Sequence, residues 1–373
     1  MLMESSLFAA MRRDVVYLNG ASRSALPDPT VEVGLFALRR KAETPWEIGD
    51  TTQIAQEIRQ LFAQLVGEGV AAEDIFLTPS CSYAISLAAR NLRSRLTSRR
   101  TRVLVLEDQM HSNVLPWQQL CDEHGGELLM IKRPANWDWT SAIESAIAGG
   151  EVAICALPPC HWCDGSLVNL DRVGAACRKG DVALVIDGTQ WIGAAPTIDA
   201  ATLGACFVAC SVHKWLLGPY GCCLCYAPRS FWKDAHPIEH HDRNREGAQH
   251  VECLPMDDSG RYPSEFMNGA RRLDSGGRPS YIIMPMIRES LNILVKQLTV
   301  PRVTAELRRY TTELARRAKE LGFHVPPHHA PNIVGLWPAA GMPAADEIVR
   351  ALAEPPVPVL LDYARSKGGG GVA

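Results

Sequence analysis

Short apolar runs alternate with longer amphipathic stretches between residues 46 and 230. The runs are rich in Val, Ile and Leu and lack the polar alternation of a half-exposed strand; they read IFLT, RVLVLE, ELLMIK, VAICAL, VALVID, CFVACS and CCLCYA. Such runs are typical of strands buried on both faces. Helical periodicity lies between them, at 54–65, 83–96, 117–123 and 171–178. The alternation predicts an α/β fold with a mostly parallel sheet covered by helices.

The chain before and at the end of this region has a different character. Residues 1–45 contain turn formers and one expected helix, and we interpret them as an N-terminal arm. Residues 46–280 form the expected large α/β domain. Its last part, 231–280, is polar and rich in His, Asp, Arg and Gly. We predict that this part is a long loop near a functional site.

The remainder of the chain is predicted to form a smaller C-terminal α+β domain over residues 281–373. Residues 281–322 have helical periodicity and end at a glycine. The run IVGLW at 333–337 has the composition of a strand, and a further helix is expected at 344–352. This pattern mixes helices with a strand instead of repeating the regular alternation of the large domain.

Composition limits the class of protein. The 38 basic residues nearly balance the 41 acidic ones, and the net charge of −3 argues against a nucleic-acid-binding protein. No apolar run approaches the roughly 20 residues that cross a bilayer. The first residues, MLMESSLFAAMRRD, place their charges after a short apolar stretch, the reverse of a signal peptide. We therefore expect a cytoplasmic protein, in which the 12 cysteines are free thiols.

Polar residues follow two neighbouring runs of the expected sheet. Asp187 ends one run and is followed closely by Gln190; Ser211 ends the next and is followed by His213 and Lys214. The carboxyl ends of parallel strands are where open α/β sheets bind ligands. A lysine and a strand-end carboxylate are what pyridoxal phosphate requires, as Schiff-base partner and as partner of the pyridine nitrogen. Taken singly, such an Asp is more often a cap and such a Lys more often a surface charge.

A candidate phosphate site lies earlier in the chain. The segment FLTPSCSYAISLAARNL has the pattern of a strand, a turn and a helix, with Ser80, Cys81 and Ser82 at the helix start. Free backbone N–H groups and the helix dipole favour an anion there. An ordinary serine cap is the alternative interpretation.

The two segments DGTQWIGAAPTID and SVHKWLLGPYG resemble the class V aminotransferase family of fold type I pyridoxal-phosphate enzymes, which includes cysteine desulfurases, isopenicillin N epimerase-like proteins and C–S lyases. The resemblance extends from YLNGASRSALP to RRLDSGGRP. It implies that Asp187 binds the pyridine nitrogen, that Gln190 contacts the phenolic oxygen and that Lys214 forms the Schiff base. It also implies that Ser211 and His213 touch the phosphate.

The same resemblance assigns further cofactor contacts. Cys81 and Ser82 match phosphate-binding positions. The residue stacked on the pyridine ring is Met110 or His111, and the sequence leaves this choice open. Trp162 lies where the family has a residue near the phenolic oxygen. Gly276 and Gly277 match a segment that reaches the phosphate of the neighbouring subunit, which implies a homodimer with shared active sites.

The substrate is less defined by the sequence. Family members hold the substrate carboxylate with an arginine in a C-terminal motif that has no match here, so the candidates for substrate contacts are Asn19, Arg23 and Arg278. Desulfurases also need a cysteine nucleophile in the C-terminal part, and in this sequence no cysteine follows Cys253. These features disfavour desulfuration by a persulfide.

Our leading hypothesis is a pyridoxal-phosphate enzyme acting on an amino acid or a cysteine S-conjugate. We favour β-elimination with cleavage of a C–S bond, in a setting such as the tailoring of secondary metabolites. Transamination, epimerisation and decarboxylation with oxidative deamination are the alternatives on the same scaffold. A non-catalytic protein of this fold and a zinc-binding structural protein are alternatives of a different class.

Possible metal ligands occur, but we expect no metal site. Cys222 and Cys225 have the spacing of some zinc sites, yet positions i and i+3 of a strand face opposite sides. Cys160 and Cys163 have the same spacing. The histidines between 236 and 250 fit better with a polar flap over an active site.

Overall fold

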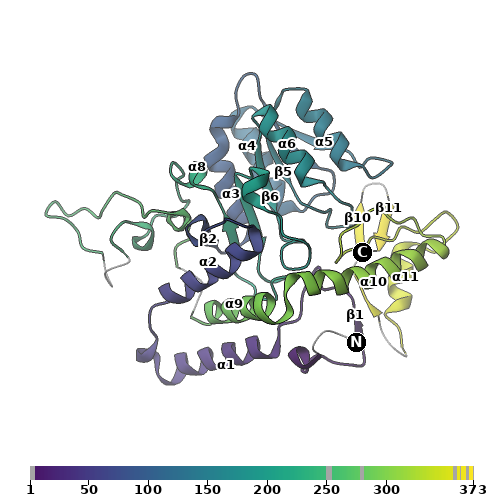
Figure 1. The fold of residues 1–373 in the computed structure, drawn as a ribbon, viewed down its shortest axis with the longest axis horizontal. Coiled ribbons are helices and arrows are strands. Elements are labelled where there is room, and N and C mark those ends of the chain that lie inside the picture. Colours follow the sequence, from purple (N-terminus) through teal and green to yellow (C-terminus); the bar gives the residue numbers. More distant parts are fainter. Residues whose placement is uncertain are drawn as a thin grey trace.

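The computed structural model describes residues 5–248, 254–277, 281–355, 359–361, 363–366 and 369–372. Its centre is a seven-stranded sheet with the order β2-β8-β7-β6-β5-β3-β4 (Figure 1). The strands are β2 (Ile75–Thr78), β3 (Arg102–Leu106), β4 (Glu127–Ile131), β5 (Val152–Leu157), β6 (Ala183–Asp187), β7 (Phe207–Ser211) and β8 (Cys223–Tyr226). Within this sheet β8 is antiparallel to both of its neighbours, and the other pairs are parallel. The predicted α/β fold with a mostly parallel sheet is confirmed, and each predicted run is a strand.

Helices surround this sheet. The α-helices are α1 (Asp28–Glu43), α2 (Thr52–Val66), α3 (Cys81–Leu92), α4 (Leu115–His124), α5 (Trp139–Ala148), α6 (Leu170–Gly180), α7 (Ala200–Leu203), α8 (Arg229–Trp232), α9 (Ile283–Asn292), α10 (Val300–Glu320) and α11 (Ala345–Leu352). Short 3-10 helices are η1 (Ser5–Phe8), η2 (Pro45–Glu47), η3 (Ala72–Asp74), η4 (Arg93–Arg95), η5 (His111–Asn113), η6 (Asp242–Asn244) and η7 (Ala270–Leu273); η8 (Ile293–Leu298) is a π-helix. The helices expected from periodicity at 54–65, 83–96, 117–123 and 171–178 correspond to α2, α3 with η4, α4 and α6.

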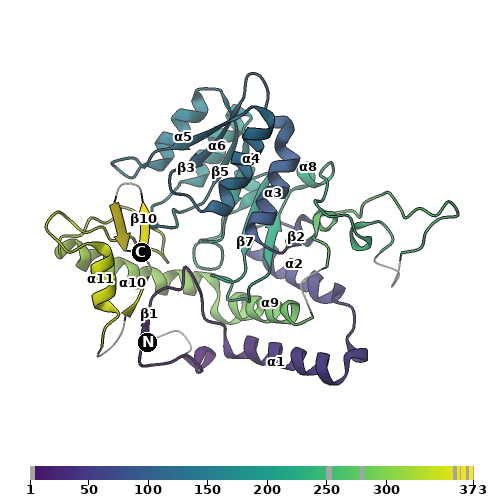
Figure 2. The ribbon, with the colours of Figure 1, turned by 180° about the vertical axis from the view of Figure 1, so that it is seen from behind.

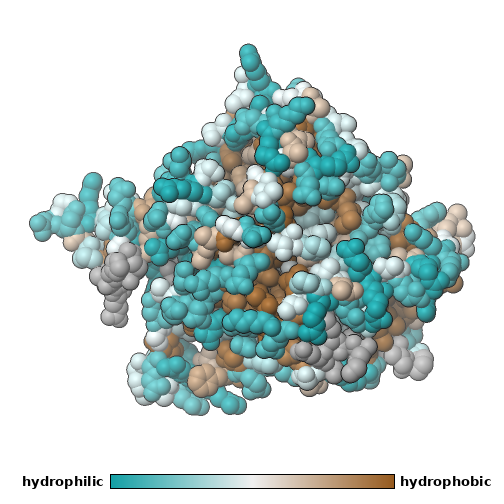
Figure 3. All heavy atoms as spheres, in the orientation of Figure 1, coloured by the Kyte–Doolittle hydropathy of each residue, from teal (hydrophilic) through white to brown (hydrophobic). Residues whose placement is uncertain are grey.

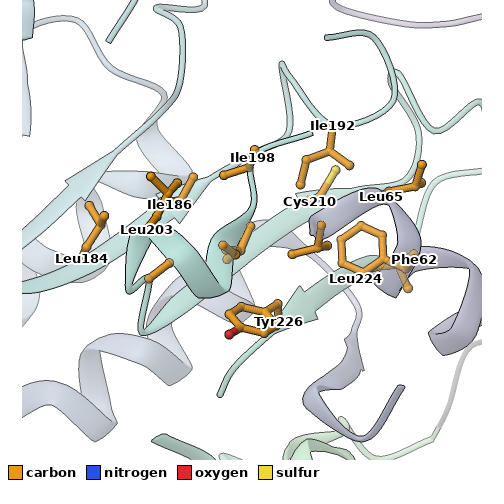
Figure 4. Close-up of a cluster of buried hydrophobic side chains, with 14 of the residues drawn as sticks. Phe62, Leu65, Leu184, Ile186, Ile192, Ile198, Leu203, Cys210, Leu224 and Tyr226 are labelled. Carbon is orange, nitrogen blue, oxygen red and sulfur yellow. The ribbon is translucent and has the colours of Figure 1, made fainter. Parts of the chain in front are cut away.

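Each face of the sheet has its own hydrophobic core. Helices α3, α4 and α8 cover one face, where Phe76 and Phe207 meet edge to face. Helices α2, α5, α6, α7 and α9 cover the other face. Figure 4 shows part of this second core, in which Phe62 of α2 lies close to Leu224 of β8. Because both faces are covered, the inner strands need no polar side.

The burial of each strand explains its sequence. Every residue of β5, β6, β7 and β8 is buried, whereas β4 at the edge of the sheet is partly exposed. Full burial of a Val, Leu or Ile side chain stabilises a fold by about 1.5–3 kcal/mol. The continuous apolar runs of the sequence are therefore the strands that gain most from the two helical layers.

The N-terminal arm and the C-terminal part meet at one side of the molecule. Strand β1 (Val16–Tyr17) pairs in parallel with β9 (Val359–Leu360), and β10 (Tyr363–Ser366) pairs with β11 (Gly369–Val372). Figure 2 shows β1 beside α10 and α11, on the side of the molecule where the C-terminus lies. The arm also contributes α1, which packs against α9.

The region expected to form the C-terminal domain contributes to the main core and, among its described residues, to two smaller hydrophobic clusters, one of which joins Ile293 and Leu298 to Leu7. Met284, Ile287 and Leu291 of α9 belong to the main core beneath the sheet. A separate small cluster contains Ala315 and Ala318 of α10 with Val325 and Val334. The division of the chain at residue 281 stays a prediction.

Residues 333–337, expected to be a strand, belong to no named strand among the described residues; Leu336 and Trp337 are in bridge positions, and Trp337 pairs with His324. The prediction of a strand here was wrong because this segment binds a turn. The Gly335 N–H donates to the Asp164 carbonyl at 2.8 Å. A Cβ on Gly335 would lie 2.6 Å from Asp164 Cα, so glycine permits the close approach.

The expected loop between α8 and α9 is present. Among its described residues, η6 and η7 are the only helical turns. Figure 1 shows this segment reaching away from the body of the molecule. Figure 3 shows hydrophilic residues over most of the same face, with hydrophobic residues gathered near its middle around α9. In the described part of the chain no helix combines the length and apolarity that a membrane span requires.

Candidate active site

The polar residues predicted at the ends of β6 and β7 lie at one edge of the sheet. Asp187 is 7% exposed, and its Oδ1 accepts a hydrogen bond from the Thr189 N–H at 3.0 Å. Thr189 Oγ1 accepts from the Ser211 N–H at 3.2 Å. Thr189 therefore ties the ends of the two strands together, and the buried carboxylate and the strand preceding Lys214 are held as one unit.

Lys214 lies in a tight turn after β7 and is 8% exposed. Its carbonyl accepts hydrogen bonds from Ser24 Oγ at 2.7 Å and from the Leu217 N–H at 2.9 Å. Leu217 has φ +57°, a left-handed conformation that costs a leucine energy. Ser290 Oγ of α9 donates to the Leu217 carbonyl at 2.7 Å and is itself paired with Thr30 of α1. The turn is thus held by the arm and by α9.

Gln190 connects three segments of the chain. Its Nε2 donates to the Ala21 carbonyl of the N-terminal arm at 3.0 Å, and its Oε1 accepts from Trp215 Nε1 at 2.9 Å. Its own carbonyl accepts from Asn332 Nδ2 at 2.9 Å. Since Gln190 is 7% exposed, these contacts fix its side chain in a nearly dry environment.

The residues predicted to contact a phosphate lie at the start of α3. Ser80 is the N-cap, and its Oγ accepts from the Tyr83 N–H at 3.1 Å. The hydroxyl of Ser82 lies 3.0 Å from that of Ser80 and is exposed, while Cys81 is buried. A hydrogen bond with Cys223, burial and the charge of Asp187 raise the pKa of the Cys81 thiol. Cys81 is thus a neutral side chain beside Asp187, and Ser82 is the hydroxyl that an incoming phosphate can reach.

His213, next to the lysine, is kept neutral. Its ring stacks on Tyr220 with 4.2 Å between the centroids. Burial, and secondarily the charge of Lys214, lowers the pKa of His213 to about 4. A neutral imidazole can donate one hydrogen bond to a phosphate without repelling the lysine.

The loop after β3 carries the two candidates for the stacked residue. Met110 is half-buried and His111 is exposed on η5. Gln109 braces the loop by donating from Nε2 to the carbonyls of Asn113 and Ala156, both at 3.1 Å. The choice between Met110 and His111 stays a prediction.

Trp162 is bound to the same loop. Its Nε1 donates to the Asp108 carbonyl at 2.7 Å. His161, which precedes it, is fully buried; its ring is parallel to that of Trp139, and its Nε2 is 2.9 Å from the Glu107 carbonyl. The segment that carries Trp162 is therefore bound to residues 107–108, which follow β3 and precede Met110.

Asp164 forms a buried ion pair with Arg133 that the sequence did not reveal. The guanidinium carbon of Arg133 lies 5.4 Å from the ring centres of Trp137 and Trp139 and 5.5 Å from that of Trp337. Cation–π contacts of this kind strengthen when they are shielded from water. The cluster attaches the C-terminal part to the loop that carries Trp162.

Gly276 and Gly277, expected to reach the phosphate of a partner subunit, follow the buried residue Asp274, which is bound to two other segments. Asp274 is paired with Arg59 of α2, and its Oδ1 accepts from the Leu77 N–H at 2.8 Å. Gly276 donates from its N–H to Glu239 Oε2 at 2.5 Å, and the exposed Gly277 has φ +56°. Arg278, a candidate for substrate binding, lies outside the described residues.

The other two candidate substrate residues lie in the N-terminal arm. The Asn19 carbonyl is bound by Tyr17 Oη at 3.0 Å, while its Oδ1 is buried and has no hydrogen-bond partner. Arg23 is exposed. The arm passes the site, since Ala21 binds Gln190 and a Cβ on Gly20 would lie 3.8 Å from the Trp215 ring. The segment that follows Asn19 therefore contacts Gln190 and Trp215.

Several residues of this arrangement were missed by the sequence analysis: Ser24, Arg133, Thr189, Trp215 and Asn332. Thr189 and Trp215 stand directly beside predicted site residues, and that proximity was the available signal. Ser24, Arg133 and Asn332 meet the site only through the fold, and no local pattern marks them.

Metal ligands do not gather in the structure. Among the described residues, no three side chains of His, Cys, Asp or Glu lie together in a way that could hold a metal ion. Cys222 belongs to the core on one face of the sheet and Cys225 to the core on the other, as the spacing in a strand predicted.

The donor set fits pyridoxal phosphate. It offers a buried carboxylate at a strand end, a buried amine, a fixed amide and a helix N-terminus with an exposed hydroxyl. The fold and these donors define the class of fold type I pyridoxal-phosphate enzymes. The chain belongs to the aminotransferase class-V family, whose profile matches residues 16–271.

Two curated relatives with sequences similar to that of the chain are cysteine desulfurases. It is 25% identical over 232 residues to a probable cysteine desulfurase of Pyrococcus abyssi, an alignment that covers 61% of this chain and 57% of that protein. It is 25% identical over 246 residues to a cysteine desulfurase of Klebsiella pneumoniae, covering 62% and 59%. The match thus spans less than two thirds of the length of these relatives.

Solved structures share the fold over a longer stretch. The Escherichia coli cysteine desulfurase superposes with a TM-score of 0.79 at 18% identity, covering 98% of this chain and 91% of that one. A cystine C–S lyase in complex with its product, cysteine persulfide, superposes with a TM-score of 0.78 at 18% identity, covering 98% and 93%. The α/β architecture is therefore that of fold type I enzymes.

Proposed function

We propose that this protein is a pyridoxal-phosphate-dependent C–S lyase that acts on cysteine, cystine or another cysteine S-conjugate. The observation that carries the proposal is the pair of buried groups at the carboxyl ends of β6 and β7, the Asp187 carboxylate and the Lys214 amine, joined through Thr189. A structural protein would gain nothing from two ionisable groups buried beside a strained turn.

Each side chain has a proposed role in holding the cofactor. Asp187 keeps a proton on the pyridine nitrogen, and Gln190 donates to the phenolic oxygen. The N-terminus of α3 with Cys81 and Ser82 receives the phosphate, together with Ser211 and His213. Met110 or His111 covers the ring, and Trp162 lies near the phenolic oxygen. Lys214 is the covalent partner of the cofactor.

The reaction needs one base and one acceptor of electrons. When bound, the cofactor accepts the electron pair left by the Cα proton. Lys214 removes that proton as general base, and Asp187 stabilises the ring nitrogen by its charge. The Cβ–S bond then breaks, the sulfur leaves as a thiolate that takes up a proton, and water releases the remainder as pyruvate and ammonia. The balance needs no oxidant or reductant.

Three buried cysteines of the sheet, Cys155, Cys210 and Cys223, are poor candidates for the nucleophile of a desulfurase, which supports elimination. A desulfurase attacks sulfur with a cysteine thiolate, which requires an accessible thiol of ordinary or lowered pKa. Burial raises the pKa of Cys210 and Cys223, and a hydrogen bond with Cys177, followed by burial, raises that of Cys155. The names of the curated relatives make cysteine desulfurase the second candidate.

We also propose that the enzyme works as a cytoplasmic homodimer. Gly276 and Gly277 would contact the phosphate of the partner subunit, and Asn19, Arg23 or Arg278 would bind the substrate carboxylate. Tailoring of a secondary metabolite is the proposed setting. Equilibrium sedimentation of the holoenzyme tests the dimer, since a monomer with full activity would contradict shared sites.

The experiment that tests the function is product analysis. The protein is reconstituted with pyridoxal phosphate and mixed with cystine, a cysteine S-conjugate or cysteine, without an oxo acid. We expect pyruvate, ammonia and a thiol or persulfide. Alanine and enzyme-bound persulfide would identify a desulfurase, and an oxo acid that retains the sulfur, with pyridoxamine phosphate, an aminotransferase. Lys214→Ala is the control, and product formation by this variant would refute the proposed role of the lysine.

A further inference from the structure

We propose that Trp215 is a positioning residue that fixes the amide of Gln190 in one of its two orientations, so that an N–H of Gln190 faces the cofactor. This inference rests on the proposed function. It concerns Trp215, which follows Lys214 in the same turn and is assigned no role in binding the cofactor.

The two partners of the Gln190 side chain leave one amide orientation. Trp215 Nε1 carries a hydrogen and can only donate, so the atom 2.9 Å from it must be the Gln190 oxygen. The Ala21 carbonyl can only accept, so the atom 3.0 Å from it must be the Gln190 nitrogen. An amide rotated by 180° would place donor against donor and acceptor against acceptor. At a site that is 7% exposed, water cannot repair such a mismatch cheaply.

In this orientation the Gln190 amide has one N–H that is not bound by Ala21. The Gln190 amide nitrogen has two hydrogens, and Ala21 takes one of them. The second is available to the phenolic oxygen that Gln190 is proposed to contact. In the rotated amide, the oxygen lone pairs of Gln190 would lie there instead and would repel a negatively charged phenolic oxygen.

Both ends of this arrangement are themselves held. The Gln190 backbone carbonyl accepts from Asn332 Nδ2 at 2.9 Å. The backbone of Trp215 is close to Gly193, where a Cβ would lie 2.5 Å from the Trp215 carbonyl oxygen. This close backbone approach fixes the part of the chain that carries the indole, and the hydrogen bond to Gln190 Oε1 then selects the amide orientation. Ala21 alone would leave the oxygen end of Gln190 without a donor.

Trp215→Phe tests the inference, because it keeps a ring and removes the N–H. We expect the pH midpoint of the absorbance change of the bound cofactor to rise by up to about one unit, since a phenolic oxygen that loses a hydrogen-bond donor becomes more basic. Loss of one such bond is also expected to weaken cofactor binding to the apoprotein by about 3- to 10-fold. Trp215→His, which keeps a ring N–H, is the second variant and is expected to lie closer to the wild type.

The matched control is Trp232→Phe. Trp232 lies on α8, away from the site, and its Nε1 donates to Asp74 Oδ1 of η3 at 3.1 Å. This variant loses a hydrogen bond of the same kind and should keep the pH midpoint and cofactor affinity of the wild type. Equal shifts in both variants would overturn the inference, because the effect would then follow from a general loss of stability.

A double-variant cycle decides whether Trp215 acts through Gln190. In a Gln190→Ala background, Trp215→Phe should cause no further shift of the pH midpoint and no further loss of affinity. Additive effects, or a wild-type midpoint in Trp215→Phe, would overturn the role of Trp215. Neither result touches the proposed function, which instead fails if Lys214→Ala forms the same coloured complex and the same products as the wild type.

Discussion

The carboxyl edge of the sheet and the interior of the same strands are both buried, but they hold different kinds of side chain. At the edge lie Asp187, Gln190 and Lys214, each less than a tenth exposed. One or more residues back along β5 and β7 lie the buried thiols of Cys155 and Cys210. Burial therefore does not separate functional from structural residues in this protein.

What separates the two regions is the supply of hydrogen-bond partners. At the edge, loops and the arm bring Thr189, Ser24 and Trp215 to the polar groups. In the interior, the backbone groups are already used by the strand ladders, and a side chain finds few partners. Weakly polar thiols tolerate that shortage, whereas amides and charges do not.

The largest expected difference between the regions is in catalysis at Lys214. Lys214→Ala should lower the proposed C–S cleavage by about 10³-fold or more, because it removes the proposed general base and covalent partner of the cofactor. Steady-state kinetics measures the loss, with circular dichroism to check the fold. Activity within tenfold of the wild type would show that the edge is not the catalytic centre.

Asp187→Asn should have the next largest effect. The amide has nearly the size of the carboxylate but lacks its charge, so kcat should fall by about 10²–10³-fold while the fold is retained. Single-turnover measurements separate this loss from weaker cofactor binding. An unchanged kcat would place the partner of the pyridine nitrogen elsewhere.

The neutral state of His213 predicts a pH dependence of stability. The pKa of His213 is about 4 in the folded chain and 6.5 in the unfolded chain, so between these values the unfolded chain binds more protons. The free energy of unfolding should fall as the pH drops from 6.5 to 4 and should change no further through this residue below that.

Urea unfolding of the apoprotein at several pH values tests this dependence. His213→Gln should flatten the decline between pH 6.5 and 4, the window set by the pKa of His213. The control is His124→Gln, at the exposed C-terminal end of α4. A decline that persists unchanged in His213→Gln would mean that other groups bind the protons.

The smallest effect is expected in the interior. Cys155→Ala removes a buried thiol that is hydrogen-bonded to Cys177, and it should cost about 1 kcal/mol of stability while kcat/KM stays within about twofold. Alkylation should also be slow, because the raised pKa of Cys155 leaves little thiolate. A large loss of activity in Cys155→Ala would show that the interior of the sheet, and not only its carboxyl edge, is needed for activity.

The sequence predicts the strands because apolar runs mark the segments buried on both faces. Asp187, Gln190 and Lys214 follow such runs, but their expected roles come from the resemblance to the class V family and stay predictions. Contacts between distant segments leave no such mark. Arg133 and Trp337 meet only when the C-terminal part packs against the loop after β4. In the segment 333–337, where a strand was expected, the Gly335 N–H instead donates to the Asp164 carbonyl.

The pairing of β1 with β9 bears on the order in which the site is completed during synthesis. Val16 and Val359 lie near opposite ends of the sequence, yet they are neighbours in a parallel ladder. The arm that supplies Ala21 and Ser24 to the site emerges from the ribosome first and finds this partner strand last. Since contacts of long sequence separation form slowly, the sheet can fold while the arm is still unattached. A nascent chain would then form its hydrophobic core before Ser24 of the arm binds the Lys214 carbonyl and completes that turn.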